Sequence, residues 1–265
     1  MNTPFCILTI AGSDSGGGAG IQADQRAIAS IGGHALTAVT AVTAQDTRGV
    51  SAWRPVPAGL IAAQVDSALR GFPVAAMKTG LLPGIAAVLA VARTLARFPP
   101  VPLVVDPVLS SSSGTRFLSE AGIRALRERL LPRASLVTPN WPEAAALTGL
   151  PVRTFAQASK AALRLASECG APVLVKGGHG PGRVCRDCLA MPGGGVLWFE
   201  NPRIDTSNTH GTGCVLSAAI ASWLGRGADL ASAVRLAESF MQRGLFRSRG
   251  LDWGSGRGPA FIGNR

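Results

Sequence analysis

The chain has 265 residues, of which 47% are hydrophobic, and a formal net charge of +11. A chain of this length and composition can bury a substantial core, as one large domain or as two small ones. No linker rich in Pro or Ser and no block of charge divides it, so we expect one domain over residues 1–265. Only the tail at 250–265 stays unassigned.

The positive charge is almost entirely arginine, because the chain contains only the lysines Lys78, Lys160 and Lys176. Tyrosine is absent, and basic residues do not alternate with aromatic ones, so we expect no nucleic-acid partner. A basic surface still favours small polyanions such as nucleotides. The sequence shows no signal peptide, and its longest uncharged run, 206–225, is too polar to span a bilayer. We therefore expect a soluble, cytoplasmic protein with no membrane partner.

Short apolar runs alternate with helical patterns along the whole chain. In chain order, the patterns predict strands at 5–11, 35–42, 50–56, 74–79, 103–106, 136–138 and 173–176. They predict helices at 21–31, 58–71, 85–98, 119–131, 142–148, 155–169, 214–224 and 230–246, and a hairpin at about 183–203. This alternation indicates an α/β fold with a mostly parallel central sheet and helices on both faces. In such sheets ligands bind at the carboxyl ends of the strands, where the candidate residues below cluster.

A glycine-rich loop at 12–20 joins the first predicted strand to the first helix. It lacks the G-x-G-x-x-G spacing of dinucleotide-binding proteins, and no P-loop motif occurs in the chain. Its glycines instead let the backbone approach a ligand closely. Asp24, one turn into the helix, is either a surface acid that complements the helix dipole or an acceptor aimed at that ligand.

Polar residues at three further strand ends each have two interpretations. Gln45 is a turn residue, or an amide that offers both a donor and an acceptor to a heteroaromatic ring. Asn140 and Glu143 form a helix capping box or organise Mg²⁺ through water, and the same two residues can have both roles. Lys176 ends an apolar strand, which favours a phosphate contact over a surface role.

The five cysteines do not form a disulfide framework. Cys185 and Cys188 match C-x-x-C, but no second pair of metal ligands accompanies them. They also lie in the predicted hairpin and not at a helix start. We therefore assign them no zinc or redox role.

The most informative stretch is DTSNTHGTGCVLS at 205–217. The turn Gly211–Thr212–Gly213 leads directly into a predicted buried helix, so backbone amides and the helix dipole create an anion site suited to a phosphoryl group. Cys214 lies on the first helical turn, where the pKa of a thiol is expected to fall and its thiolate to become accessible. The alternative is a tight turn before a core helix, with Cys214 as a small hydrophobic residue.

Six motifs occur in order between residues 7 and 244: AGSDSGGGAGIQAD at 11–24, TAQDTRGV at 43–50, VDPV at 105–108, TPNWPEA at 138–144, LVKGGH at 174–179 and DTSNTHGTGC at 205–214. This ordered set closely resembles the hydroxymethylpyrimidine/phosphomethylpyrimidine kinases of thiamine biosynthesis, within the ribokinase-like superfamily. The resemblance implies a three-layer fold without a large lid domain, ATP with Mg²⁺ as the phosphoryl donor, and a homodimer. It also allows for a monovalent cation.

The resemblance further implies roles for individual residues. Those expected to contact the aminopyrimidine are Gly12, Asp24, Gln45, Leu81 and Val108, and those expected to contact ATP are Lys176, Thr209 and His210. The expected Mg²⁺ network is Asp106, Asn140 and Glu143. The expected catalytic groups are the anion hole Gly211, Thr212 and Gly213 and the base Cys214.

These motifs predict the ATP-dependent phosphorylation of 4-amino-5-hydroxymethyl-2-methylpyrimidine (hydroxymethylpyrimidine) and of its monophosphate to the diphosphate. One alternative is a pyridoxal kinase on the same fold, because both acceptors are nitrogen heterocycles that carry a hydroxymethyl group. A second alternative is a catalytically silent pyrimidine-binding module, which would be expected to have lost site residues that this chain retains.

Overall fold

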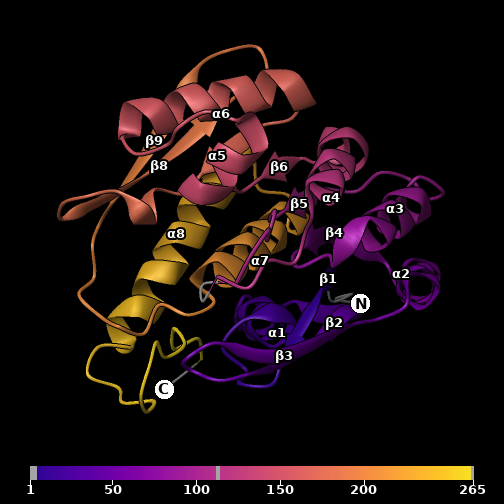
Figure 1. Cartoon of the computed structure of the whole chain (residues 1–265), viewed down its shortest axis with the longest axis horizontal. Helices are drawn as coiled ribbons and strands as arrows, with labels where there is room; N and C mark the ends of the chain where they lie inside the picture. The colour runs from indigo at the N-terminus through magenta and orange to yellow at the C-terminus, as the bar shows by residue number, and fades with distance from the viewer. Residues whose placement is uncertain (1–4, 112–113, 264–265) are drawn as a thin grey trace.

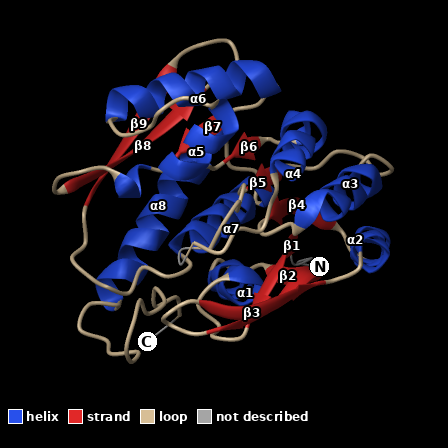
Figure 2. Ribbon diagram, in the orientation of Figure 1, coloured by secondary structure: helices blue, strands red, loops and turns tan. Residues whose placement is uncertain are grey.

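The protein is described by a computed structural model, which covers residues 5–111 and 114–263, and its nine strands form one sheet (Figures 1 and 2). The strands are β1 (Cys6–Asp14), β2 (His34–Gln45), β3 (Val50–Pro55), β4 (Val74–Thr79), β5 (Leu103–Val105), β6 (Leu136–Val137), β7 (Val173–Val175), β8 (Val184–Ala190) and β9 (Val196–Pro202). Their order across the sheet is β3-β2-β1-β4-β5-β6-β7-β8-β9.

The central six strands, β2 to β7 in the sheet order, run parallel. β3 is antiparallel to β2 at one edge, and the hairpin β8–β9 continues antiparallel from β7 at the other. The chain passes from β1 to β2 on one side and then crosses to β4 on the other side of β1. A reversal of this kind opens a crevice at the carboxyl ends of the strands, where ligands bind in α/β folds.

Helices cover both faces of the sheet, which confirms the predicted three-layer α/β architecture (Figure 2). One face carries α1 (Gly20–Ser30), α7 (Thr212–Gly225) and α8 (Leu230–Arg247). The other carries α2 (Ala58–Gly71), α3 (Gly84–Leu95), α4 (Glu120–Ala125), α5 (Trp141–Thr148) and α6 (Phe155–Cys169). Three short turns complete the list: η1 (Leu126–Leu130), η2 (Leu131–Arg133) and η3 (Gly177–His179).

Two apolar cores lie on the two faces of the sheet because successive side chains of a strand point in opposite directions. In β1, Leu8 and Ile10 are buried among residues of α2 to α6, whereas Ile7 between them is buried among residues of α1, α7 and α8. Because both faces are covered, the parallel strands appear in the sequence as continuous apolar runs.

The start of α7 lies against the glycine-rich segment that follows β1. Gly211 precedes this helix with φ = +75°, and a Cβ atom there would collide with the carbonyl of Gly18. Only glycine allows both the left-handed backbone and this close approach. The two glycine-containing motifs, far apart in the sequence, therefore meet at one point.

Most predicted elements are confirmed, and the differences have local causes. β1 continues to Asp14, inside the predicted loop, because Ser13 and Asp14 still pair with β2 after a register shift. The predicted helix 119–131 is divided into α4, a π-helical turn at η1 and a final 3₁₀ turn, where Pro132 lacks the N–H needed to extend a helix. No helix in the described part of the chain is long and apolar enough to cross a membrane.

Candidate active site

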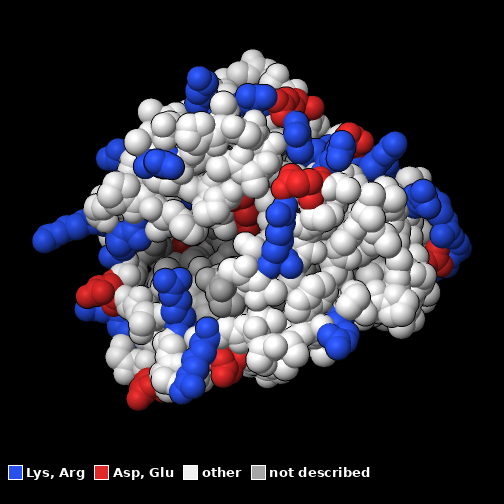
Figure 3. Space-filling model, in the orientation of Figure 1, with Lys and Arg blue, Asp and Glu red and all other residues white. Residues whose placement is uncertain are grey.

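One cavity of about 1150 Å³ follows the carboxyl ends of the central strands. Its wall comes from β1, the end of β2, the segments after β4, β5 and β7, the hairpin β8–β9, the start of α7 and one face of α8. Figure 3 shows a hollowed face of the molecule, with basic side chains around the hollow and acidic atoms visible inside it. All the predicted site residues except Asp24 line the cavity: Gly12, Gln45, Leu81, Asp106, Val108, Asn140, Glu143, Lys176, Thr209, His210, Gly211, Thr212, Gly213 and Cys214.

Asp24 is fully buried on α1 and is absent from the cavity wall. Its Oδ1 accepts a hydrogen bond from Lys78 Nζ at 2.6 Å, and its Oδ2 accepts one from Thr9 Oγ1 at 2.6 Å. Burial raises the pKa of Asp24, and the Lys78 ammonium counters this effect. The interpretation of Asp24 as a surface acid is therefore wrong, because its carboxylate forms an internal ion pair and does not line the cavity.

Gln45 ends β2 and contacts His210 across the cavity wall. Its Nε2 lies 2.8 Å from His210 Nε2, which in turn lies 3.1 Å from Asp14 Oδ2. One ring nitrogen cannot accept from Gln45 and donate to Asp14 at the same time, so the tautomer of His210 decides which contact is a hydrogen bond. His210 was expected with ATP, but its contacts here are to residues at the β1–β2 end of the cavity.

An apolar wall stands beside this amide. A Cβ atom on Gly12 would lie 2.9 Å from Leu81 Cδ2, so the backbone of β1 and the Leu81 side chain are in close contact. Leu81 is buried with Ala41 and Phe117, and Val108 packs against this cluster. An amide next to an apolar wall is a suitable environment for the edge and face of a heteroaromatic ring.

Lys176 and Asp106 form an ion pair further along the cavity. Lys176 Nζ donates to Asp106 Oδ1 at 2.7 Å, and the hydroxyls of Thr138 and Ser217 lie 3.2 and 3.3 Å from the two carboxylate oxygens. Burial disfavours the charged form of both groups, but the attraction between the ammonium and the carboxylate favours it. The pKa of Lys176 is therefore raised and that of Asp106 is lowered. The Lys176 side chain stays 14% exposed, which leaves its ammonium accessible to an anion from the cavity.

Cys214 lies on the first turn of α7, where the leading amides have no acceptor within the helix. These amides and the helix dipole favour an anion, as predicted for this motif. The expectation of a lowered thiol pKa is wrong, however. Burial raises the pKa of Cys214 to about 11, and the Lys78 ammonium only partly opposes this effect.

Asn140 and Glu143 form the capping box at the start of α5. Asn140 Oδ1 accepts from Glu143 N at 2.9 Å, and Glu143 Oε2 accepts from Asn140 N at 2.8 Å. Both residues also line the cavity, next to Asp106 and Lys176. Burial raises the pKa of Glu143 although Lys176 lowers it. The predicted capping box is thus confirmed. Because both residues also line the cavity, the same pair is available to organise Mg²⁺ through water.

Residues 255–262 contribute to the site in a way that the sequence did not suggest. His210 N donates to the carbonyl of Gly258 at 3.0 Å, and Arg257 N donates to the carbonyl of Thr47 at 2.9 Å. Ile262 is buried against α8, and Arg257 lines the cavity. This segment therefore supports both the loop that follows β2 and the loop that carries His210.

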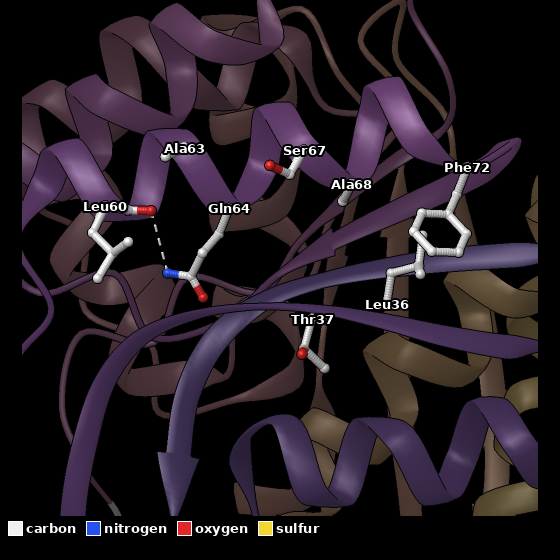
Figure 4. A pocket seen from close by; sticks show the side chains of 8 residues that line it. All are labelled: Leu36, Thr37, Leu60, Ala63, Gln64, Ser67, Ala68 and Phe72. Atoms are coloured by element: carbon white, nitrogen blue, oxygen red, sulfur yellow. Dashed lines mark hydrogen bonds between the residues drawn. The ribbon is translucent and has the colours of Figure 1, made fainter.

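Two further features add no catalytic group. Cys185 lines the cavity, whereas Cys188, three residues further along β8, points to the opposite face of the sheet, so the two cysteines do not form a pair. A separate surface hollow between β2 and α2 is lined mainly by apolar side chains (Figure 4). Its amide, Gln64, bonds to the backbone of Val39 and Leu60 and so links α2 to β2.

The comparisons with known proteins agree with this geometry. The family model described as phosphomethylpyrimidine kinase matches residues 14–260. The chain is 40% identical over 256 residues to the hydroxymethylpyrimidine/phosphomethylpyrimidine kinase of Haemophilus influenzae, covering 96% of this chain and 94% of that protein. It is similar to the ADP complex of Bacillus subtilis pyridoxal kinase, with a TM-score of 0.89, 32% identity and 98% of both chains covered. It is also similar to the structure of phosphomethylpyrimidine kinase from Clostridium difficile, with a TM-score of 0.77 and 34% identity, covering 90% of this chain and 98% of that chain. The chain therefore belongs to the phosphomethylpyrimidine kinase family, which has a ribokinase-like fold.

Proposed function

We propose that this protein transfers a phosphoryl group from ATP, with Mg²⁺, to hydroxymethylpyrimidine and then to its monophosphate. The observation that carries the proposal is that one continuous cavity joins the amide of Gln45 to the ammonium of Lys176, with Cys214 on the same wall. The H. influenzae relative is named for both acceptors, which supports the choice of substrate.

The acceptor would bind at the end formed by β1 and β2. Gln45 would present its amide to the aminopyrimidine edge, and the ring would pack against the wall that Gly12 and Leu81 form together. Because Gln45 already contacts His210, binding would exchange this internal contact for one with the acceptor.

The phosphoryl group would be transferred in front of α7. Amides at the start of this helix and the Lys176 ammonium would stabilise the charge that develops on the phosphoryl oxygens. Attack by a primary hydroxyl needs positioning more than early deprotonation in such a reaction. A thiol with a pKa of about 11 is protonated at neutral pH, so Cys214 would act as a base only when nearby cations and bound substrate favour its thiolate.

The residues present fit a magnesium ion that keeps most of its water. One oxygen of Glu143 and the amide oxygen of Asn140 are occupied by the capping box, which leaves the other Glu143 oxygen and Asp106 to hold the ion through water. When bound, the ion supplies positive charge to the phosphate oxygens of ATP.

A pyridoxal kinase is the second candidate, and the likeness to the B. subtilis structure favours it. Measurement of kcat/KM with ATP and each of hydroxymethylpyrimidine, its monophosphate and pyridoxal separates the two. We expect both pyrimidines to be better acceptors than pyridoxal, and Gln45→Ala to raise the pyrimidine KM while Gln25→Ala, on the exposed side of α1, does not. Turnover of pyridoxal alone would show that the acceptor is assigned incorrectly.

A further inference from the structure

The basic side chains on the cavity wall differ in the partners that they already have. Within residues 5–111 and 114–263, the lysines and arginines that line the cavity are Arg116, Lys176, Arg203 and Arg257. Arg116 and Lys176 each pair with a carboxylate. Arg203 donates to the carbonyls of Gly178, Gly180 and Gly182, at 3.0, 2.6 and 2.9 Å, and so holds the loop that follows β7. These three cations therefore have structural partners on the wall itself.

Arg257 is the exception. Among the described residues its guanidinium has no carboxylate or carbonyl partner, and its side chain is exposed. Its backbone, in contrast, is fixed, because Arg257 N donates to the carbonyl of Thr47 at 2.9 Å. The preceding Gly256 has φ = +146°, and a Cβ atom there would lie 2.2 Å from the same carbonyl oxygen, so only glycine allows this close approach. A fixed backbone thus presents a free and permanently charged group to the cavity.

The charge of Arg257 acts between the two ends of the cavity. Its backbone partner, Thr47, follows β2 two residues after Gln45, at the proposed acceptor end. His179 lies in η3, after β7, at the end that carries Lys176. Burial lowers the pKa of His179, and the charges of Lys176 and Arg257 lower it further. The guanidinium is therefore close to the space where a phosphoryl group would pass from donor to acceptor.

The two proposed reactions place different charges in this space. Hydroxymethylpyrimidine brings a hydroxyl group, whereas its monophosphate brings a phosphate with a charge of about −1.5 to −2 at pH 7. In the proposed reaction, Lys176 and the amides of α7 already contact the phosphates of ATP. A second phosphate beside them is repelled unless a further cation lies within reach. A guanidinium suits this role, because two of its N–H groups can donate to one phosphate in parallel.

We infer that Arg257 binds the phosphate of the monophosphate acceptor, and that it determines specificity for the second phosphorylation and not for the first. This inference rests on the proposed function. In the second reaction an oxygen of the acceptor phosphate forms a bond to the γ-phosphorus of ATP, the bond from that phosphorus to the bridging oxygen breaks, and ADP leaves. The attacking oxygen is already ionised, so the residue has to hold and orient it but has no proton to remove. In the first reaction the acceptor has no phosphate, and the guanidinium stays in solvent.

The test compares kcat/KM for hydroxymethylpyrimidine and for its monophosphate, each with saturating ATP, in the unmodified protein and in Arg257→Gln. We expect the value for the monophosphate to fall by about ten- to a hundredfold, the usual worth of a charge-assisted hydrogen bond, and the value for the alcohol to change little. Arg257→Lys keeps the charge and should recover part of the loss. Arg243→Gln, at an exposed position on α8 outside the cavity wall, removes the same charge from the protein and should leave both values unchanged.

Three outcomes would overturn the inference. Equal losses with both acceptors and a raised KM for ATP would show that the guanidinium contacts the donor. Equal losses with a lowered melting temperature would show that Arg257 only supports its own segment. Unchanged values for both acceptors would assign it to the solvated surface.

The same measurements separate this inference from the proposed function. The N–H of residue 257 keeps its hydrogen bond to Thr47 in every variant, so we expect all of them to fold. Failure of the unmodified protein to phosphorylate either pyrimidine would contradict the proposed function. Failure of Arg257→Gln to discriminate between two pyrimidines that are both phosphorylated would contradict this inference alone.

Discussion

Two lysine–aspartate pairs lie at the same edge of the sheet and have nearly the same geometry. Lys78 and Asp24 are joined by an N–O distance of 2.6 Å and both side chains are 0% exposed, whereas Lys176 and Asp106 are joined at 2.7 Å with side-chain exposures of 14% and 3%. The first pair is enclosed below the cavity, and the second forms part of its wall. An ammonium can bind a substrate anion only if solvent reaches it, so identical ion-pair chemistry serves the fold in one case and the site in the other.

The largest effect should follow the loss of the enclosed lysine. Lys78→Met leaves the Asp24 carboxylate buried with only the Thr9 hydroxyl, so we expect unfolding to become easier by about 3–5 kcal/mol in urea titrations. Lys160→Met, at an exposed position on α6, should change stability by less than about 0.5 kcal/mol. Equal stability of the two variants would mean that the enclosed pair contributes nothing to the fold.

Cys214 interacts electrostatically with both Lys78 and Lys176. Its replacement therefore tests whether the thiol near these two ion pairs takes part in catalysis or only in packing. If it is the base, Cys214→Ala should lower kcat by about 10²–10⁴-fold and leave ATP binding in place, since the α7 amides remain. Cys214→Asp should retain more activity than Cys214→Ala. A fully active and slightly destabilised alanine variant would assign the thiol to packing.

Loss of the accessible lysine should affect ATP more than the fold. Lys176→Met removes a charge-assisted contact to phosphate, worth about 1.5–3 kcal/mol, and should raise the KM for ATP or lower kcat accordingly. Its stability should fall less than that of Lys78→Met, because Asp106 keeps the hydroxyls of Thr138 and Ser217 and faces the cavity. Unchanged steady-state constants would remove Lys176 from the mechanism.

The smallest effect is a dependence on pH. Because burial raises the pKa of Cys214 to about 11, its thiolate is scarce at neutral pH and increases as the pH rises. Inactivation by iodoacetamide should therefore be slow at pH 7 and should accelerate by about tenfold per pH unit up to pH 9, followed by mass spectrometry of the Cys214 peptide. A rate that is already constant above pH 7 would show that the thiol pKa is lowered instead.

The sequence predicted the alternation of strands and helices, and with it the edge of the sheet at which Gln45, Asp106 and Lys176 meet. It did not reveal the burial of Asp24, because its partner lies 54 residues away and is brought to it when β1 pairs with β4, where Thr9 aligns with Lys78. A signal was present, since Lys78 interrupts the apolar strand VAAMKT, where a lysine needs a partner.

The properties of Cys214 show a second limit. A position at a helix start is visible in the sequence and favours a thiolate, but the burial that outweighs it depends on neighbours from other elements. The same holds for residues 255–262, whose irregular sequence gives no indication that they support the loops around His210.

The scarcity of lysine has a practical consequence. Of the three lysines, only Lys160 on α6 is exposed, since Lys78 is enclosed and Lys176 is largely covered by its ion pair. An amine-reactive dye or resin should therefore attach to α6 in preference to the other two lysines, at a position that does not line the cavity. The arginine-rich surface would not compete, because a guanidinium stays protonated where an ammonium becomes nucleophilic. Among the lysines, Lys160 is thus the preferred site for labelling or immobilisation, without any engineered cysteine.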